Sequence, residues 1–171
     1  MSLLLISCVA EESSKNKDYN PEQKLKELGI QLSSPSSPVA NYVNTVRTGN
    51  LVFISGKGPL KSDGNYVLGK LGENLTLEQG YEAARLTAIN LISTLKASIG
   101  DLSKVKKIVR VTGMVNATSN FTDHPKVVNG CSDLLVEIFG DNGKHTRAAV
   151  GMNSLPLNIA VEIDMVVELY D

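Results

Sequence analysis

The chain has 171 residues, 42% of them hydrophobic, which suits one domain plus a tail and provides enough apolar material for an ordinary core. Its 17 basic and 18 acidic residues give a net charge of −1. That balance argues against a general polyanion binder, because non-specific nucleic-acid affinity comes from neutralising phosphates. No apolar run approaches the roughly 20 residues of a transmembrane helix.

Residues 1–20 are expected to lie outside the fold, and two interpretations of them stay open. The stretch LISC, which ends at Cys8, resembles the lipidation box of a bacterial lipoprotein, with the polar tract after it as a tether. This interpretation predicts a membrane anchor at Cys8 and a periplasmic location. The alternative is a disordered tail, since no basic region precedes the apolar run and that run is short for a signal peptide.

Residues 21–171 are predicted to form a single domain that starts with a short helix. Asn20 and Pro21 suit the N-cap and first position of a helix over residues 21–30, which Gly29 ends. Residues 41–56 predict two strands joined by a Gly-containing turn, and the second strand is apolar enough to be central. The Gly-rich residues 61–72 are predicted to hold a short strand or hairpin.

Two amphipathic helices follow, separated by a strand. The first begins at Thr76, where Gln79 completes a capping box, and stops at Gly100. The strand covers residues 106–116, with Gly113 as a possible bulge. The second helix runs from about residue 125 to 139, and Cys131 on its apolar side is expected to be a buried small hydrophobe. Strands over residues 146–152 and 159–169 close the chain.

The order of elements predicts an α/β (α+β) fold, in which two long helices cover one face of a mixed sheet. Little of the sequence is left to cover the other face. The last strand alternates, with Ile159, Val161, Ile163 and their successors on one face and a mixture that includes Glu162 on the other. We therefore expect the second face to be an oligomer interface or the wall of a site.

Two charged residues interrupt the closing strands. Arg147 is surrounded by small residues, and Glu162 stands in a β-branched run. An arginine keeps its proton and its planar fork matches a carboxylate, so Arg147 must meet one. The partner is either Glu162, in a buried ion pair that fixes the register of the last two strands, or a ligand. His145 lies on the same strand face as Arg147, about 6–7 Å away.

Two sequence blocks resemble one known family. The run RAAVGMNSLPLNIAVEID is similar to the C-terminal signature of the RidA/YjgF (reactive intermediate deaminase, L-PSP endoribonuclease) family, and NYVNTVRTGNLVFISGKGPL resembles its N-terminal block. The similarity runs from about residue 41 to the C-terminus. The helix over residues 21–30 and the segment GKHTRAAVG resemble those of a divergent subgroup with an extra N-terminal helix.

The resemblance implies a chorismate-mutase-like fold that assembles as a homotrimeric barrel, with sites in the clefts between subunits. It also implies hydrolysis of reactive 2-imino acids, or their enamine tautomers, to 2-keto acids and ammonia without metal or cofactor. The substrate is then a small carboxylate, nucleic acid is not an expected partner, and the family resemblance favours a cytoplasmic location.

The same resemblance assigns roles to single residues. Arg147 would grip the substrate carboxylate, and Glu162 would position or activate water or carry the proton toward the leaving ammonia. The other positions that match substrate-binding residues are Tyr42, Ser55, Gly56 and Asn129. Each of these four residues also has a purely structural interpretation. Tyr42 would be a packing aromatic, Ser55 the end of a strand, Gly56 a turn glycine and Asn129 a surface amide.

Three positions depart from the common family pattern. Ala149 stands where a cysteine is usual, which argues against thiol chemistry but leaves a substrate contact by its backbone open. Lys57 replaces a glutamine and His145 a frequent proline, so both are expected to alter the charge of the pocket. We expect His145 to contact substrate and to make the site pH-sensitive near its ordinary pKa of about 6.5.

Two other functions compete with deamination. An endoribonuclease or translation inhibitor would need a basic groove, which the charge balance does not offer. A non-catalytic trimeric module that binds a small carboxylate or senses a metabolite would use Arg147 equally well. Glu162 favours the enzyme, because a mere binder gains little from a second, repelling carboxylate.

Overall fold

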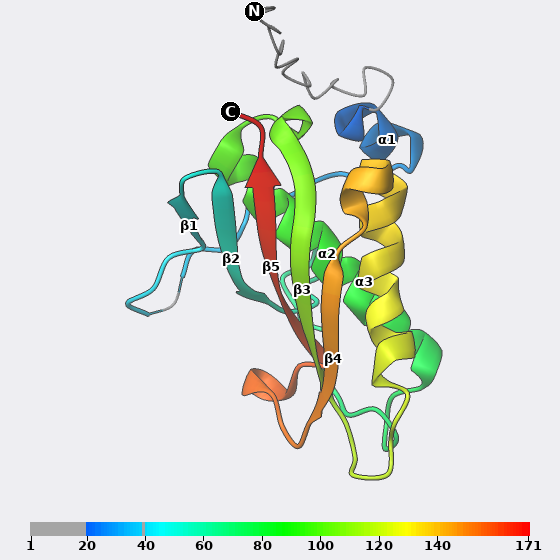
Figure 1. Ribbon diagram of the computed structural model, residues 1–171. Coiled ribbons are helices and arrows are strands. Elements are labelled where there is room, and N and C mark those ends of the chain that lie inside the picture. Colours follow the sequence, from blue (N-terminus) through cyan, green and yellow to red (C-terminus); the bar gives the residue numbers. More distant parts are fainter. Residues whose placement is uncertain (1–19, 39) are drawn as a thin grey trace, which may run out of the picture.

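A computed structural model describes residues 20–38 and 40–171 (Figure 1). The predictions for the N-terminal tail and for Cys8 lie outside these residues. No helix of the described part is long and apolar enough to cross a membrane. In chain order the elements are α1 (Pro21–Glu27), β1 (Thr45–Thr48), β2 (Leu51–Lys57), α2 (Leu77–Ile99), β3 (Val105–Asn116), α3 (His124–Phe139), β4 (Thr146–Met152) and β5 (Val161–Leu169), with short 3₁₀ turns η1 (Leu102–Lys104), η2 (Gly140–Gly143) and η3 (Pro156–Asn158).

The five strands form one mixed sheet in the order β1-β2-β5-β3-β4. All neighbouring pairs are antiparallel except β3 and β4, which run parallel with Val111 opposite Arg147. As predicted, β2 is paired on both sides. The last two strands of the sequence are not neighbours, because β3 lies between them, and this separates Arg147 from Glu162.

The two long helices lie on the same face of the sheet, as predicted (Figure 1). The capping box of α2 is present: the Thr76 hydroxyl accepts from the Gln79 amide at 3.2 Å, and the Gln79 side chain accepts from the Thr76 amide at 2.9 Å. Gly100 and Gly140 cap the C-termini of α2 and α3. At α1 the Asn20 side chain accepts from the Gln23 amide, as an N-cap should.

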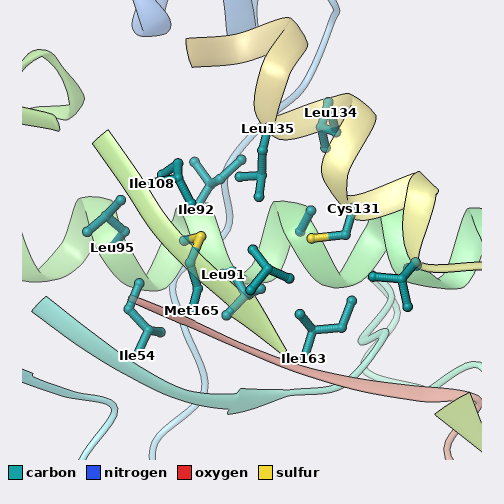
Figure 2. Close-up of a cluster of buried hydrophobic side chains, with 14 of the residues drawn as sticks. Ile54, Leu91, Ile92, Leu95, Ile108, Cys131, Leu134, Leu135, Ile163 and Met165 are labelled. Atoms are coloured by element: carbon teal, nitrogen blue, oxygen red, sulfur yellow. The ribbon is translucent and has the colours of Figure 1, made fainter. Parts of the chain in front are cut away.

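The core lies between the sheet and the helices (Figure 2). The predicted alternation of β5 is confirmed, since its odd-numbered residues are buried against the helices and its even-numbered residues are half-buried on the other face. Cys131 is fully buried in this layer, as expected. Among the large core side chains are Ile54, Ile108, Ile163 and Met165 from the sheet, Leu91, Ile92 and Leu95 from α2, and Leu134 and Leu135 from α3.

The other face of the sheet has no helix over it within the described residues (Figure 1). We call it the open face. It mixes charges with apolar side chains that an isolated chain leaves in water, a pattern typical of a contact surface. On this face lie the exposed Val46, Phe53, Val150 and Met152, together with Arg110, Thr112, Glu162, Asp164 and Glu168.

One local prediction was wrong and another was confirmed. Gly113 is not a bulge, because it pairs regularly with Ala149 and Ile163, and the register shifts of β3 fall near its start. Its lack of a side chain serves packing instead, since a Cβ there would lie 2.6 Å from Val128 of α3. The short hairpin predicted within residues 61–72 is present, because Leu60 and Tyr66 form an antiparallel bridge and the Lys61 amide donates to the Asn65 carbonyl at 2.8 Å.

Candidate functional site

Arg147 lies on the edge strand β4 and directs its side chain toward α3. Its Nη1 donates to Oδ1 of Asn129 at 2.8 Å and to Oγ of Ser132 at 3.0 Å. Within the described residues its Nε and Nη2 have no hydrogen-bond or ion-pair partner, and the residue is exposed. Two nitrogens of the planar fork are therefore available to bind a carboxylate in bidentate fashion.

His145 and Ser132 extend this contact into a chain of hydrogen bonds. His145 Nδ1 lies 2.6 Å from the carbonyl oxygen of Gly143, and its Nε2 lies 3.0 Å from the Ser132 hydroxyl. A carbonyl only accepts, so Nδ1 carries the proton, and the Nε2 of a neutral ring accepts from Ser132. Ser132 in turn accepts from Arg147. The order of donation is thus Arg147 to Ser132 to His145 to Gly143.

The environment of His145 favours the neutral form of its ring. Burial lowers its pKa, the bond to the Gly143 carbonyl acts in the opposite direction, and the charge of Arg147 lowers it further. Gly143 itself is fixed in place, because η2 passes so close to α3 that a Cβ on Gly143 would lie 2.3 Å from the carbonyl oxygen of Leu135. His145 is therefore expected to act on Arg147 through Ser132, rather than through a contact of its own with substrate.

Small residues follow Arg147 along the same face of β4. Ala149 packs partly against the core, and Gly151 lies under the ring of His124, whose Nε2 would be 2.2 Å from a Cβ added there. His124 in turn meets Phe121 edge to face, with ring centroids 5.5 Å apart. Gly151 and the His124 ring over it lie about 13 Å along the strand from Arg147, at roughly 3.3 Å per residue.

Glu162 lies on the open face of β5. Burial raises the pKa of its carboxyl, and the neighbouring Asp164 on the same face raises it further. Within the described residues it has no hydrogen-bond or ion-pair partner. A partly desolvated carboxyl without a fixed partner suits proton transfer, because its pKa moves toward the working pH.

Ser55, Gly56 and Tyr42 lie on the Glu162 side of the molecule. The register of β2 against β5 shifts between Ile54 and Lys57, which leaves one extra residue at Ser55–Gly56, as in a β-bulge. Gly56 leaves room for the Glu162 carboxyl, since a Cβ there would lie 2.3 Å from Oε1 and the carboxyl would have to shift. The Ser55 hydroxyl donates to the Val43 carbonyl at 2.7 Å and so holds the segment that carries the exposed Tyr42.

Arg147 and Glu162 therefore do not form the ion pair considered from the sequence. They lie two strands apart and on opposite faces of the sheet, with β3 between them. A single chain therefore carries two groups of candidate site residues that cannot meet within it. We call them the arginine half-site (Arg147, Asn129, Ser132, His145, Ala149) and the carboxylate half-site (Glu162, Gly56, Ser55, Tyr42).

Two residues alter the sequence-based picture of the pocket. Lys57 follows the bulge and points away from Glu162: its Nζ donates to Asn44 Oδ1 at 2.5 Å, and it lines a cavity of about 30 Å³ with Asn90 of α2. Burial lowers the pKa of Lys57.

Ser132 was missed by the sequence reasoning. The available signal was its position three residues after Asn129, which puts both polar side chains on one side of the helix.

Neither thiol nor metal chemistry is evident in the described residues. The buried Cys131 has its pKa raised to about 12 by burial, so it is no nucleophile. Across residues 20–38 and 40–171 no three His, Cys, Asp or Glu side chains are grouped so that they could hold a metal ion. The chemistry available is that of a guanidinium, an amide, a hydroxyl, an imidazole and a carboxyl.

Comparisons with known proteins find one matching family and several similar proteins. Residues 22–169 match the profile of the family described as "YjgF/chorismate_mutase-like, putative endoribonuclease". The protein TCP17 of Trypanosoma cruzi is 41% identical over 146 residues, which cover 85% of this chain and 91% of TCP17. Two solved structures are also similar.

The first is the protein Atu1372 of Agrobacterium tumefaciens, whose function is described as unknown. It is 40% identical, with a TM-score of 0.82 over 88% of this chain and 92% of that one. The second is described as "a putative endoribonuclease" from Shewanella oneidensis. It is 35% identical, with a TM-score of 0.85 over 88% of this chain and 99% of that one. These matches agree with the predicted fold.

Proposed function

Because the chain belongs to the YjgF/chorismate-mutase-like family, we propose that it hydrolyses small 2-imino acids, or their enamine tautomers, to 2-keto acids and ammonia. The observation that carries the proposal is the state of Arg147. Its Nη1 is held by α3, while Nε and Nη2 have no partner in the described part of the chain. A charged fork with one end anchored and the other open is suited to a carboxylate that comes from outside.

Glu162 supplies the group that moves protons. As water attacks the carbon of the protonated imine (C=NH2⁺), the ionised carboxyl accepts a proton from the water, and a C–O bond forms while the C=N double bond becomes single. The carboxylic acid then protonates the amine nitrogen, which becomes –NH3⁺. Collapse of this protonated carbinolamine breaks the C–N bond, forms the ketone and releases ammonia, while the hydroxyl proton passes to the carboxylate. The carboxyl then gives this proton to the released ammonia or to solvent and is ionised again. A carboxyl whose pKa is raised by burial is suited to both directions of transfer.

The two half-sites require a second copy of the chain. Glu162 and Arg147 of one protomer face opposite sides of the sheet, so a complete site needs the arginine half-site of one protomer beside the carboxylate half-site of its neighbour. We propose that this occurs in a homotrimer, in which a cyclic interface repeats the same cleft three times. The open face, with its exposed Val46, Phe53 and Val150, supports this assembly.

The same arginine half-site would also serve a protein that only binds carboxylates, and Glu162 separates the two functions. An enzyme needs Glu162 for turnover, whereas a binding protein is expected to bind an anion equally well or better without a second negative charge nearby. The net charge of −1 gives no support to an endoribonuclease.

The experiment generates 2-imino acids in place with an amino-acid oxidase and follows their decay against the uncatalysed background. Arg147→Ala is expected to lower kcat/KM by about 10²-fold or more through loss of positioning, and Glu162→Gln to lower kcat by about 10²–10⁴-fold. Arg85→Ala, which changes an arginine on α2 that belongs to neither half-site, is the matched control. Decay of every imine at the background rate, together with binding of 2-keto acids, would favour the binding protein. RNA cleavage by rigorously purified protein that is lost with Arg147→Ala would favour the nuclease.

A further inference from the structure

We infer that Ser132 and His145 are positioning residues for Arg147, and that binding of a carboxylate to Arg147 is coupled to uptake of a proton by His145. The inference rests on the proposed role of Arg147 as the carboxylate-binding group. It goes further by assigning a function to two side chains that do not themselves need to touch substrate. It also predicts that a proton is taken up when a carboxylate binds, which deamination alone does not require.

The positioning follows from the contacts. An exposed arginine on an edge strand has several rotatable bonds and loses entropy when it is held in one geometry. Here Asn129 and Ser132 are both on α3 and each accepts one hydrogen bond from Nη1. Ser132 can accept with a fixed orientation because its own proton is directed to His145. His145 therefore determines which lone pair of Ser132 faces Arg147.

The proton coupling follows from charge. His145 and Arg147 are both bonded to the Ser132 hydroxyl, at 3.0 Å each, so a positive His145 would lie close to the positive Arg147. A bound carboxylate neutralises the field of Arg147. The cost of protonating His145 then falls, and a proton from solvent can occupy Nε2. The Ser132 oxygen then accepts from both nitrogens, and its hydroxyl keeps its proton and turns away from His145 toward a different acceptor.

The direction of the pH effect is fixed by this linkage. The pKa of His145 is lowered in the unliganded protein, first by burial and also by the charge of Arg147. An anion at Arg147 removes the second cause, so the pKa rises on binding. Binding then takes up protons between the two pKa values and becomes tighter as pH falls through that window, near and below the ordinary value of about 6.5.

The other charged groups around His145 do not reverse the expected rise of its pKa when a carboxylate binds to Arg147. The neighbouring Lys144 and Asp141 on η2 form an ion pair with each other at 2.7 Å, so they largely cancel. Asp133, next to Ser132 on α3, accepts a hydrogen bond from the Tyr81 hydroxyl at 3.0 Å. Cys131 on α3 is neutral at these pH values because burial raises its pKa to about 12.

The test measures binding of pyruvate, a 2-keto acid that does not react further and stays ionised throughout the range. Isothermal titration calorimetry in buffers of different ionisation enthalpy gives the number of protons taken up between pH 5.5 and 8. For the wild type we expect uptake of a fraction of one proton and an affinity about three- to tenfold higher at pH 5.5 than at pH 8.

Four variants separate positioning from general structural effects. Ser132→Ala should bind about three- to tenfold more weakly at every pH, since one hydrogen bond to a charged group is lost. Ser132→Thr keeps the hydroxyl and should restore binding. His145→Gln keeps a neutral acceptor for Ser132, so it should bind like the wild type at pH 8 and lose the pH dependence. The chain has only two histidines, and His124→Gln, the matched control, should keep the pH dependence.

Ring-proton NMR provides a direct readout, because two histidines give two sets of ring signals that these variants assign. Pyruvate should raise the pKa of His145. An unmoved His145 pKa, or proton uptake that survives His145→Gln, would overturn the inference while leaving deamination intact. Absence of pyruvate binding by the wild type down to pH 5.5 would overturn both this inference and the carboxylate-binding role of Arg147.

Discussion

The charged groups of the two half-sites differ in how firmly the chain holds them. In the arginine half-site, the side chain of Arg147 is tied by Asn129 and Ser132, and the connection continues through His145 to a backbone carbonyl. In the carboxylate half-site, Glu162 has no partner within the described residues and its pKa is raised by burial. The difference matches the tasks proposed for them, because a group that grips an anion needs a fixed direction, whereas a group that transfers protons needs a responsive pKa.

The largest expected effect tests whether the two half-sites come from different protomers. Arg147→Ala and Glu162→Gln should each be inactive, but unfolding them together and refolding the mixture should restore activity. With random mixing, about a quarter of the clefts would pair an intact arginine half-site with an intact carboxylate half-site. The measurement is deaminase activity of the mixture against each variant refolded alone. A mixture as inactive as its components would show that no site is shared between protomers.

The next prediction contrasts two glycines that are both close to a neighbour. Gly56→Ala places a Cβ 2.3 Å from Oε1 of Glu162, and Gly113→Ala places one 2.6 Å from Val128. The first should displace the catalytic carboxyl and lower kcat by about tenfold or more, since misplacing a catalytic group by about 1 Å is costly. The second should destabilise the fold by about 1–3 kcal/mol through overpacking and leave the kcat of the folded fraction nearly intact.

Imine decay assays and urea unfolding measure the two effects. Similar losses of kcat in both variants would mean that Gly56 serves packing alone and that Glu162 does not depend on it. If Gly56→Ala lost as much stability as Gly113→Ala, this would also indicate that Gly56 serves packing.

Much of the fold was predictable because each helix and strand carries a local signal. Thr76 and Gln79 marked the start of α2, and the alternation in β5 separated core residues from the open face. The pairing of strands was not predictable in this way. The ion-pair alternative assumed that the last two strands are neighbours, but β4 pairs parallel to β3 at the far edge. Strand order is a long-range property, and neither charge patterning nor propensity determines it.

The candidate site was predictable from family resemblance for its charged residues and less so for their supports. Arg147 and Glu162 stand out as charges within apolar strands. Ser132 does not, because a serine on a helix is ordinarily a surface or packing residue, and its role appears only when β4 brings Arg147 alongside α3. A contact between His145 and substrate stays a prediction. In the structure both ring nitrogens of His145 have hydrogen-bond partners within the chain.

A smaller effect concerns the pKa of Glu162. Burial is the first cause of its raised pKa and the charge of Asp164 is the second, so Asp164→Asn should lower it without restoring the ordinary value. If ionised Glu162 is the base, the acid limb of the kcat/KM profile should move to lower pH in this variant. Profiles of the wild type and the variant from pH 4.5 to 8 measure the shift. An acid limb at the same pH would mean that another group controls it.

The smallest expected effect compares two glutamates on the open face of β5. Glu168 lies six residues after Glu162 on the same face, but it pairs with Lys106 at 2.7 Å. The side chains of Lys106 and Glu168 are 45% and 30% exposed, so solvent screens the pair, and Glu168→Gln should leave the free energy of unfolding nearly unchanged. It should leave kcat unchanged, whereas Glu162→Gln should abolish turnover with little change in stability, because Glu162 loses no ion pair. Chemical denaturation and imine decay of the two variants measure both quantities. If the two glutamates cost equal activity, the open face would act through its summed negative charge, and Glu162 would have no individual role in proton transfer.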